Sequence, residues 1–257
     1  MQESAGGNIS NMLNKVPEVT FVFWIIKIMA TTVGETAADF LAGDLKLGLG
    51  GTSVLMAGLL LISLFLQIRS KKYIPWLYWL TVVLVSIVGT LISDNLVDNL
   101  GVTLQAITMT FSLALLFVFI AWYASQQTLS IHAIHTTRRE MFYWAAILIT
   151  FALGTAAGDL AAEGLNLGYA TSAMIFGGLI GLVYFTYYVF KANAIAAFWI
   201  AYILTRPFGA SCGDLLSQPN ANGGLALGTT GTSAVFLLII LGLVGHLTLR
   251  QKVAAAR

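Results

Sequence analysis

A Trp, a Gly ten residues later and an Asp five residues after that form a pattern that occurs four times in the chain. Successive copies begin 55, 65 and 55 residues apart, so the chain consists of four repeats of one unit. Each Asp follows an apolar segment, and an acidic residue at such a place in a membrane protein is a candidate functional residue. The four copies are Trp24/Gly34/Asp39, Trp79/Gly89/Asp94, Trp144/Gly154/Asp159 and Trp199/Gly209/Asp214.

The composition indicates a membrane protein. Hydrophobic residues make up 58% of the chain and charged residues 9%, against about 25% charged residues in a typical soluble domain. Too few charges remain to cover a soluble bundle, and long apolar runs recur along the whole chain. The single Cys212 excludes an intramolecular disulfide and a metal site built from several thiolates.

Each repeat contains two apolar segments, which predicts an all-α integral membrane protein with eight transmembrane helices. Two helices return the chain to the side where it started, so all four repeats are parallel and an axis along the membrane normal relates them. The sequence leaves pseudo-fourfold and pseudo-twofold symmetry open. We expect a flexible tail over residues 1–14 and one membrane domain over 15–257, with repeats near 19–72, 73–124, 140–192 and 195–250.

Basic residues predict the orientation. They lie at the chain ends and between repeats, whereas the turns inside repeats hold only Lys46. This asymmetry places both termini in the cytoplasm and the four repeated Asp residues at the opposite face. The repeated Trp residues are then expected at the cytoplasmic interface as membrane anchors.

Eight of the eleven acidic residues gather near the predicted outer face. Asp98 and Glu163 follow a repeated Asp by four residues, which places them on the same helix face if the helix continues. Carboxylates, hydroxyls and amides are hard oxygen donors and suit a cation such as Mn²⁺ or Mg²⁺. We therefore predict a metal site from Asp39, Asp94, Asp159, Asp214 and Glu35, with Asp98 and Glu163 contributing to cation binding.

Three charged residues lie inside the predicted helices at positions that carry no charge in the other repeats. Lys27 and Glu35 belong to the first repeat and lie two turns apart on one face, whereas Arg206 belongs to the fourth. Lys27 and Arg206 are candidates for gating or coupling. The alternative is a buried ion-pair cluster that holds the first and fourth repeats together.

The repeated glycines have a simpler interpretation. Small residues allow transmembrane helices to approach closely, and more small residues surround each copy. We therefore assign Gly34, Gly89, Gly154 and Gly209 to helix packing.

Several stretches resemble a family of bacterial multi-pass inner-membrane proteins, over residues from about Lys15 to Arg250. They read KVPEVTFVFWIIKIMATTVGETAADFLAGDL, GTLISDNLVDNLGV, GTAAGDLAAEGLNLGY and TRPFGASCGDLLSQP. The resemblance implies a bacterial cytoplasmic membrane and supplies no catalytic residue.

These observations predict a transporter of a hard, divalent cation, working as an exporter or a proton-coupled exchanger. A cation channel and a non-transporting membrane scaffold or assembly protein remain the alternatives. No nucleophile and base are suitably placed, so we expect no enzyme, no catalytic residues and no cofactor. The expected partners are the lipid bilayer and the cation, without nucleic acid, and the sequence leaves homo-oligomer formation open.

Overall fold

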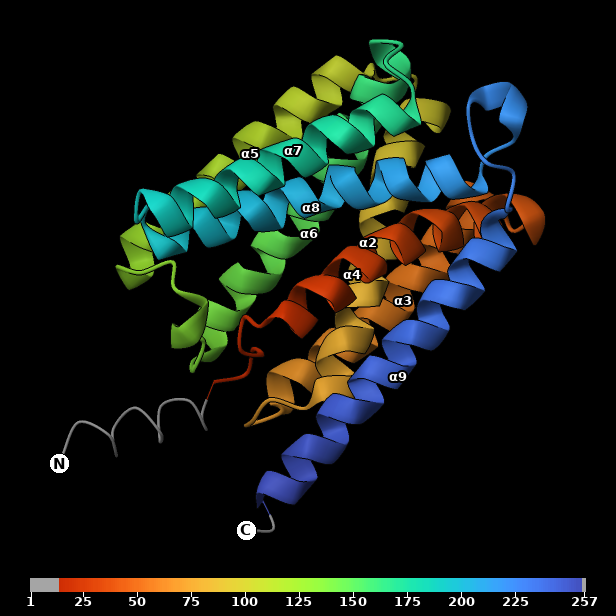
Figure 1. Ribbon diagram of the computed structural model, residues 1–257. Helices are drawn as coiled ribbons and strands as arrows, with labels where there is room; N and C mark the ends of the chain where they lie inside the picture. Colours follow the sequence, from red (N-terminus) through yellow and green to blue (C-terminus); the bar gives the residue numbers. More distant parts are fainter. Residues whose placement is uncertain (1–13, 256–257) are drawn as a thin grey trace, which may run out of the picture.

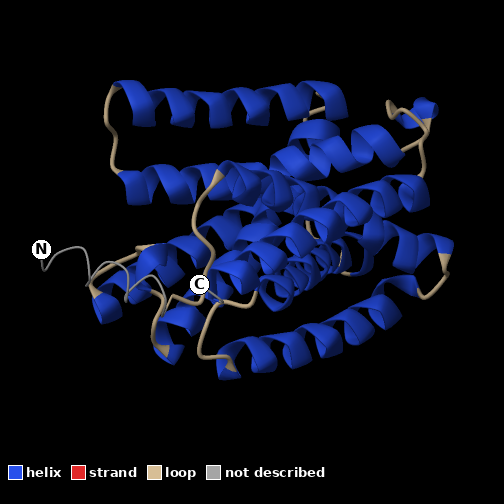
Figure 2. Ribbon diagram, turned by 60° about the horizontal axis from the view of Figure 1, so that its bottom comes forward, coloured by secondary structure: helices blue, strands red, loops and turns tan. Residues whose placement is uncertain are grey.

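The computed structural model describes residues 14–255, so the predicted tail over 1–14 lies outside the described residues except for Asn14. Within residues 14–255 the chain is helical throughout and contains no strand (Figure 2). The long helices are α2 (Phe21–Asp39), α3 (Gly48–Arg69), α4 (Pro75–Asp94), α5 (Leu104–Gln126), α6 (Thr137–Asp159), α7 (Tyr169–Val189), α8 (Ala194–Ser217) and α9 (Thr229–Ala255). Short 3₁₀ turns are η3 (Ile131–Ala133) and η5 (Asn220–Asn222).

Eight helices in the described part of the chain are long and apolar enough to cross a membrane. Their starts follow from local chemistry, because the side chains of Thr20, Thr103, Thr136 and Asn193 accept hydrogen bonds from the first turn of α2, α5, α6 and α8. Pro75 begins α4, where a missing backbone N–H costs nothing.

The first helix of each repeat lies inside the bundle. These inner helices, α2, α4, α6 and α8, pack in a closed ring in chain order, with α8 returning to α2 (Figure 1). Buried residues make up 44–67% of the apolar span of each inner helix, against 11–22% for α3, α5, α7 and α9. The outer helices therefore present most of their apolar surface to the surroundings.

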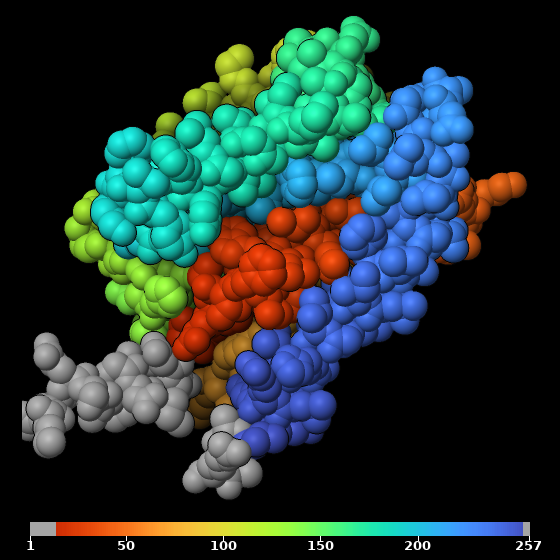
Figure 3. All heavy atoms as spheres, in the orientation of Figure 1, coloured from red at the N-terminus to blue at the C-terminus, as the bar shows by residue number. Residues whose placement is uncertain are grey.

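Each outer helix packs on the inner helix of the following repeat. Thus α3 packs on α4, α5 on α6 and α7 on α8, whereas α9 packs on α2. Figure 3 shows the exposed face of α2 (red) between α7–α8 (cyan) and α9 (blue). The last outer helix therefore packs on the first inner helix, an arrangement that repeat spacing alone does not reveal.

The repeated glycines lie where neighbouring inner helices touch. A Cβ atom added to any of them would collide with the residue three positions before the glycine of the next repeat. These contacts match the predicted packing role. The pairs are Gly34 with Ser86, Gly89 with Phe151, Gly154 with Arg206, and Gly209 with Thr31.

The repeated Trp residues correct one expectation. Trp79, Trp144 and Trp199 are buried in the core, where aromatic rings surround them. Trp199 also donates a hydrogen bond from Nε1 to the Leu129 carbonyl at 2.9 Å. Three of the four therefore pack inside the bundle and do not anchor its outer surface.

A π-helical turn follows the repeated Asp in the first three repeats. These turns are η1 (Phe40–Asp44), η2 (Asn95–Asn99) and η4 (Leu160–Gly164). A π turn bonds i to i+5 and so holds an extra residue, which rotates the residues beyond it relative to an α-helix. Such turns are frequent at functional sites.

Candidate cation site between the inner helices

Residues spaced four apart on the inner helices form layers across the centre of the ring. Each layer takes one residue from the same position of every repeat. Most of these side chains are buried, whereas Phe198, Asp39, Asp94 and Asp159 are half-buried. From the N-terminal ends of the helices to their C-terminal ends, the layers are Phe23, Tyr78, Tyr143 and Phe198; Lys27, Val82, Ile147 and Tyr202; Thr31, Ser86, Phe151 and Arg206; Glu35, Thr90, Thr155 and Ala210; and Asp39, Asp94, Asp159 and Asp214.

The layers at the N-terminal ends are closed by side chains that contact one another. The hydroxyls of Tyr78 and Tyr143 share a hydrogen bond of 2.5 Å. In the next layer, Lys27 Nζ lies 4.3 Å from the ring centres of both Phe151 and Tyr202. Lys27 is fully buried, and its Nζ has no hydrogen-bond partner within residues 14–255.

Arg206 and Glu35 form an ion pair in the middle of the ring. Arg206 Nη2 lies 3.0 Å from Glu35 Oε2, and both residues are buried. The same guanidinium donates to Thr155 Oγ1 at 2.7 Å, to Thr90 Oγ1, and to the Thr31 carbonyl at 3.1 Å. The predicted proximity of Glu35 and Arg206 is thus observed, whereas Lys27 forms no ion pair with Glu35 in the described chain.

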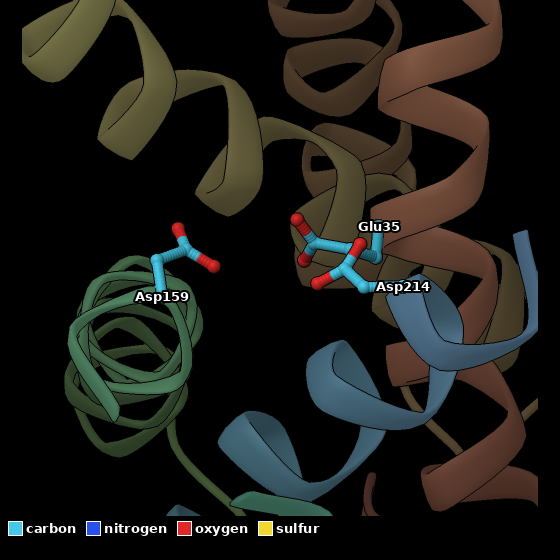
Figure 4. A group of neighbouring side chains, drawn as sticks. All are labelled: Glu35, Asp159 and Asp214. Atoms are coloured by element: carbon cyan, nitrogen blue, oxygen red, sulfur yellow. The ribbon is translucent and has the colours of Figure 1, made fainter. Parts of the chain in front are cut away.

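Glu35 also belongs to a group of three carboxylates, which we call the carboxylate cluster. Glu35 on α2, Asp159 on α6 and Asp214 on α8 each place one oxygen within 4.8 Å of the other two. Figure 4 shows these carboxylates pointing toward one another across the space between three helices. Glu35 therefore faces Arg206 and the two aspartates at once.

The C-terminal ends of the inner helices carry an excess of negative charge. We call this region the acidic end and define it as Glu35, Asp39, Asp94, Asp159 and Asp214. Within residues 14–255, Arg206 is the one cationic side chain that forms an ion pair with any of them. Like charges held this closely in a region of low dielectric repel strongly unless a cation or protons neutralise them.

The four predicted acidic residues outside the carboxylate cluster fall into two groups. Asp39 and Asp94 are half-buried beside the carboxylate cluster, although outside its 4.8 Å limit. Asp98 and Glu163 lie in the π turns and are exposed, and Glu163 accepts a hydrogen bond from Tyr169 at 2.8 Å. The sequence predicts them on the same helix face as Asp94 and Asp159 if the α-helix continues. The helix does not continue as an α-helix, because a π turn follows each of these aspartates.

The structure contains a second buried ion pair that was not predicted from the sequence. Lys15 Nζ lies 2.6 Å from Glu140 Oε2 and also donates to the Ile68 carbonyl at 2.9 Å. This contact joins the segment before α2 to the C-terminal end of α3 and the first turn of α6. The available signal was Glu140 itself, an isolated acid far along the chain from the other acidic clusters.

The comparisons with known proteins agree with the internal repeats. No curated protein and no solved structure matches the chain. A family model described as Repeat of Unknown Function (DUF347) matches four times, over residues 22–73, 77–128, 142–193 and 197–252. Each match contains one inner and one outer helix. The chain therefore belongs to the DUF347 family, as four consecutive copies of its repeat.

Proposed function

We propose that this protein transports a hard divalent cation, such as Mn²⁺ or Mg²⁺, across a membrane. The observation that carries the proposal is the carboxylate cluster, in which three helices bring their oxygens within 4.8 Å of one another. Carboxylate oxygens are the preferred protein ligands of Mg²⁺, Ca²⁺ and Mn²⁺.

The spacing of these oxygens suits a common cation. Ligand oxygens lie about 2.3–2.6 Å from Ca²⁺ and about 2.0–2.1 Å from Mg²⁺. Two ligands on opposite sides of one ion are therefore about 4–5 Å apart, which is the scale of the cluster. A small contraction of the three carboxylates would suit the smaller ion, and water would complete its shell.

The filled centre of the ring favours a transporter over a channel. Beyond the carboxylate cluster, Arg206 and Phe151 lie in one layer and Tyr202 in the next, and all three are fully buried. A permanently open pore would need a wet path through these layers. We therefore propose that the inner helices move to open the N-terminal end during transport.

The setting of the site is part of the same proposal. We propose that the eight helices span a bacterial cytoplasmic membrane around a pseudo-fourfold axis along the membrane normal, with both termini in the cytoplasm. The closed ring of inner helices supports this symmetry, and the distribution of basic residues supports the orientation. The acidic end then faces the compartment outside the cytoplasm.

Flux measurements in proteoliposomes test this function. Mn²⁺, Mg²⁺, Ca²⁺, Na⁺ and K⁺ would be compared for the wild-type protein and for Asp159→Asn and Asp214→Asn. Each Asp→Asn variant retains the shape of the side chain and removes one charged ligand. We therefore expect the wild type to transport one divalent ion and each variant to show a flux lower by about tenfold or more. Asp98→Asn is the matched control, because Asp98 is exposed on a π turn, and it should retain wild-type flux.

Two results would contradict the proposal. The first is the absence of flux for every ion with folded wild-type protein, which would favour a scaffold whose acidic end is a docking surface. The second is a flux that persists in Asp159→Asn and Asp214→Asn, because the path would then avoid the carboxylate cluster.

A further inference from the structure

Arg206 lies in the middle of the ring of inner helices. It is fully buried, and its hydrogen bonds reach α2, α4 and α6 from its own position on α8. The corresponding residues of the other repeats are Thr31, Ser86 and Phe151. The arginine is therefore a feature of one repeat placed where it can contact all four.

The surroundings of Arg206 accommodate this side chain specifically. Gly154 has no side chain at the point where Cβ and Cγ of Arg206 pass α6. Thr90 and Thr155 present hydroxyl oxygens to Nη2. An arginine is charged at every physiological pH, so a positive charge stands permanently at this position.

The bonding of Arg206 is nevertheless incomplete. Its Nε is buried and has no hydrogen-bond partner within residues 14–255. Pro207 follows it inside α8, and a proline removes one backbone hydrogen bond from the helix. Both features lower the cost of moving this side chain relative to a fully satisfied buried ion pair.

Glu35 connects Arg206 to the carboxylate cluster. Its Oε2 lies 3.0 Å from Arg206 Nη2, while its carboxylate also lies within 4.8 Å of Asp159 and Asp214. A cation bound by these three residues would lie close to the guanidinium and be repelled by it. The bound cation and Arg206 therefore compete for Glu35.

We propose that Arg206 is a built-in competitor of the transported cation. It pairs with Glu35 and blocks the centre of the ring in the cation-free protein, and it releases Glu35 when a divalent ion joins Asp159 and Asp214. A monovalent ion gains half the Coulomb energy from the same carboxylates, so the competitor selects against Na⁺ and K⁺. This inference rests on the proposed cation site and specifies how that site discriminates by charge.

The test is a binding measurement that needs no transport. The protein in lipid nanodiscs is titrated with Mn²⁺, and free Mn²⁺ is followed by electron paramagnetic resonance. Removing the competitor in Arg206→Gln should lower the Kd for Mn²⁺ by about tenfold, which lies within the range of coupling energies between interacting groups in proteins. It should also permit K⁺ to compete with Mn²⁺ at concentrations that leave the wild type unaffected. Arg250→Gln, at an exposed position on α9, is the matched control and should bind as the wild type does.

A second variant keeps the test decisive if Arg206→Gln does not fold, because breaking a buried ion pair can destabilise the protein. Arg206→Lys retains the buried charge but cannot reach Glu35, both threonines and the Thr31 carbonyl together. We expect its Kd for Mn²⁺ to fall by a smaller factor than in Arg206→Gln. If Arg206→Gln does not fold, Arg206→Lys decides.

The possible failures can be distinguished. Wild-type protein that binds no Mn²⁺, or binds it equally well after Asp159→Asn, overturns the cation site and the competitor together. Wild-type binding that Asp159→Asn abolishes, with an unchanged or higher Kd in the folded Arg206 variants, overturns the competitor alone. Arg206 would then be a structural link between the first and fourth repeats.

Discussion

The two ends of the inner helices handle buried charge in opposite ways. At one end, which we call the closed end, Lys15 pairs with Glu140, and the Tyr78 and Tyr143 hydroxyls bond to each other. At the acidic end, four aspartates and Glu35 share the single guanidinium of Arg206 within residues 14–255. The closed end therefore pairs its outermost buried charges, although Lys27 one turn further in has no partner within residues 14–255, whereas the acidic end carries an excess of one charge.

This difference separates stability from function. Buried partners that satisfy each other favour one conformation of the protein. Unpaired like charges destabilise the protein alone and are retained where a ligand neutralises them. We therefore expect substitutions at the closed end to reduce stability, whereas substitutions at the acidic end should reduce cation binding.

The largest loss of stability is expected at the closed end. Glu140→Gln leaves the Lys15 ammonium buried beside a neutral amide, and breaking a buried pair in this way costs about 3 kcal/mol. Such a loss corresponds to a decrease in Tm of about 5–10 °C in a thermal unfolding measurement in detergent. The double substitution Lys15→Met/Glu140→Met removes both charges and should recover most of the loss. Equal Tm values for Glu140→Gln and the wild type would show that the pair contributes little.

A smaller loss is expected between the two ends, where the glycines set the distance between helices. Gly154→Ala places a methyl group against Cβ and Cγ of Arg206 and Cδ of Pro207, atoms whose positions are set by the backbone of α8. Overpacking of this kind costs about 2 kcal/mol. The matched control is Gly158→Ala, one turn further along α6, where an added Cβ would make ordinary contacts of 3.5 Å and longer. Thermal unfolding should therefore show a decrease for the first variant and none for the second, and equal decreases would contradict the close packing at Gly154.

Much of the difference between the two ends could be predicted from the sequence. Repeats with the same internal spacing place equivalent residues at the same level along the inner helices. The four aspartates, the packing glycines and the proximity of Glu35 to Arg206 could all be predicted from their positions in the repeats. Apolar composition likewise predicts the eight long helices.

Other features depend on contacts between distant segments. The outer helix α9 packs on α2 at the other end of the chain, and no local pattern in either helix specifies its partner. The π turns after Asp39, Asp94 and Asp159 have no sequence signature that distinguishes them from a continuing α-helix. Asp98 and Glu163 lie within these turns at exposed positions, whereas the carboxylate cluster consists of Glu35, Asp159 and Asp214.

The smallest change in stability is expected at the acidic end, where a substitution should raise stability, whereas substitutions at the closed end lower it. Asp94 is half-buried within electrostatic range of Glu35, Asp159 and Asp39. Asp94→Asn relieves this repulsion and should raise stability by about 1 kcal/mol or less. Thermal unfolding without divalent cations should therefore give a slightly higher Tm, whereas Asp98→Asn, at an exposed position four residues on, should leave it unchanged.

Adding Mn²⁺ should reverse the order of Asp94→Asn and the wild type. A ligand that binds only the folded protein stabilises it in proportion to the logarithm of its concentration over Kd. Weaker attraction of the cation in the variant then gives a smaller increase in Tm than in the wild type. A higher Tm for Asp94→Asn both with and without Mn²⁺ would mean that the charge of Asp94 opposes folding without assisting cation binding. The negative charge of Asp94 would then not be required for cation binding by the carboxylate cluster.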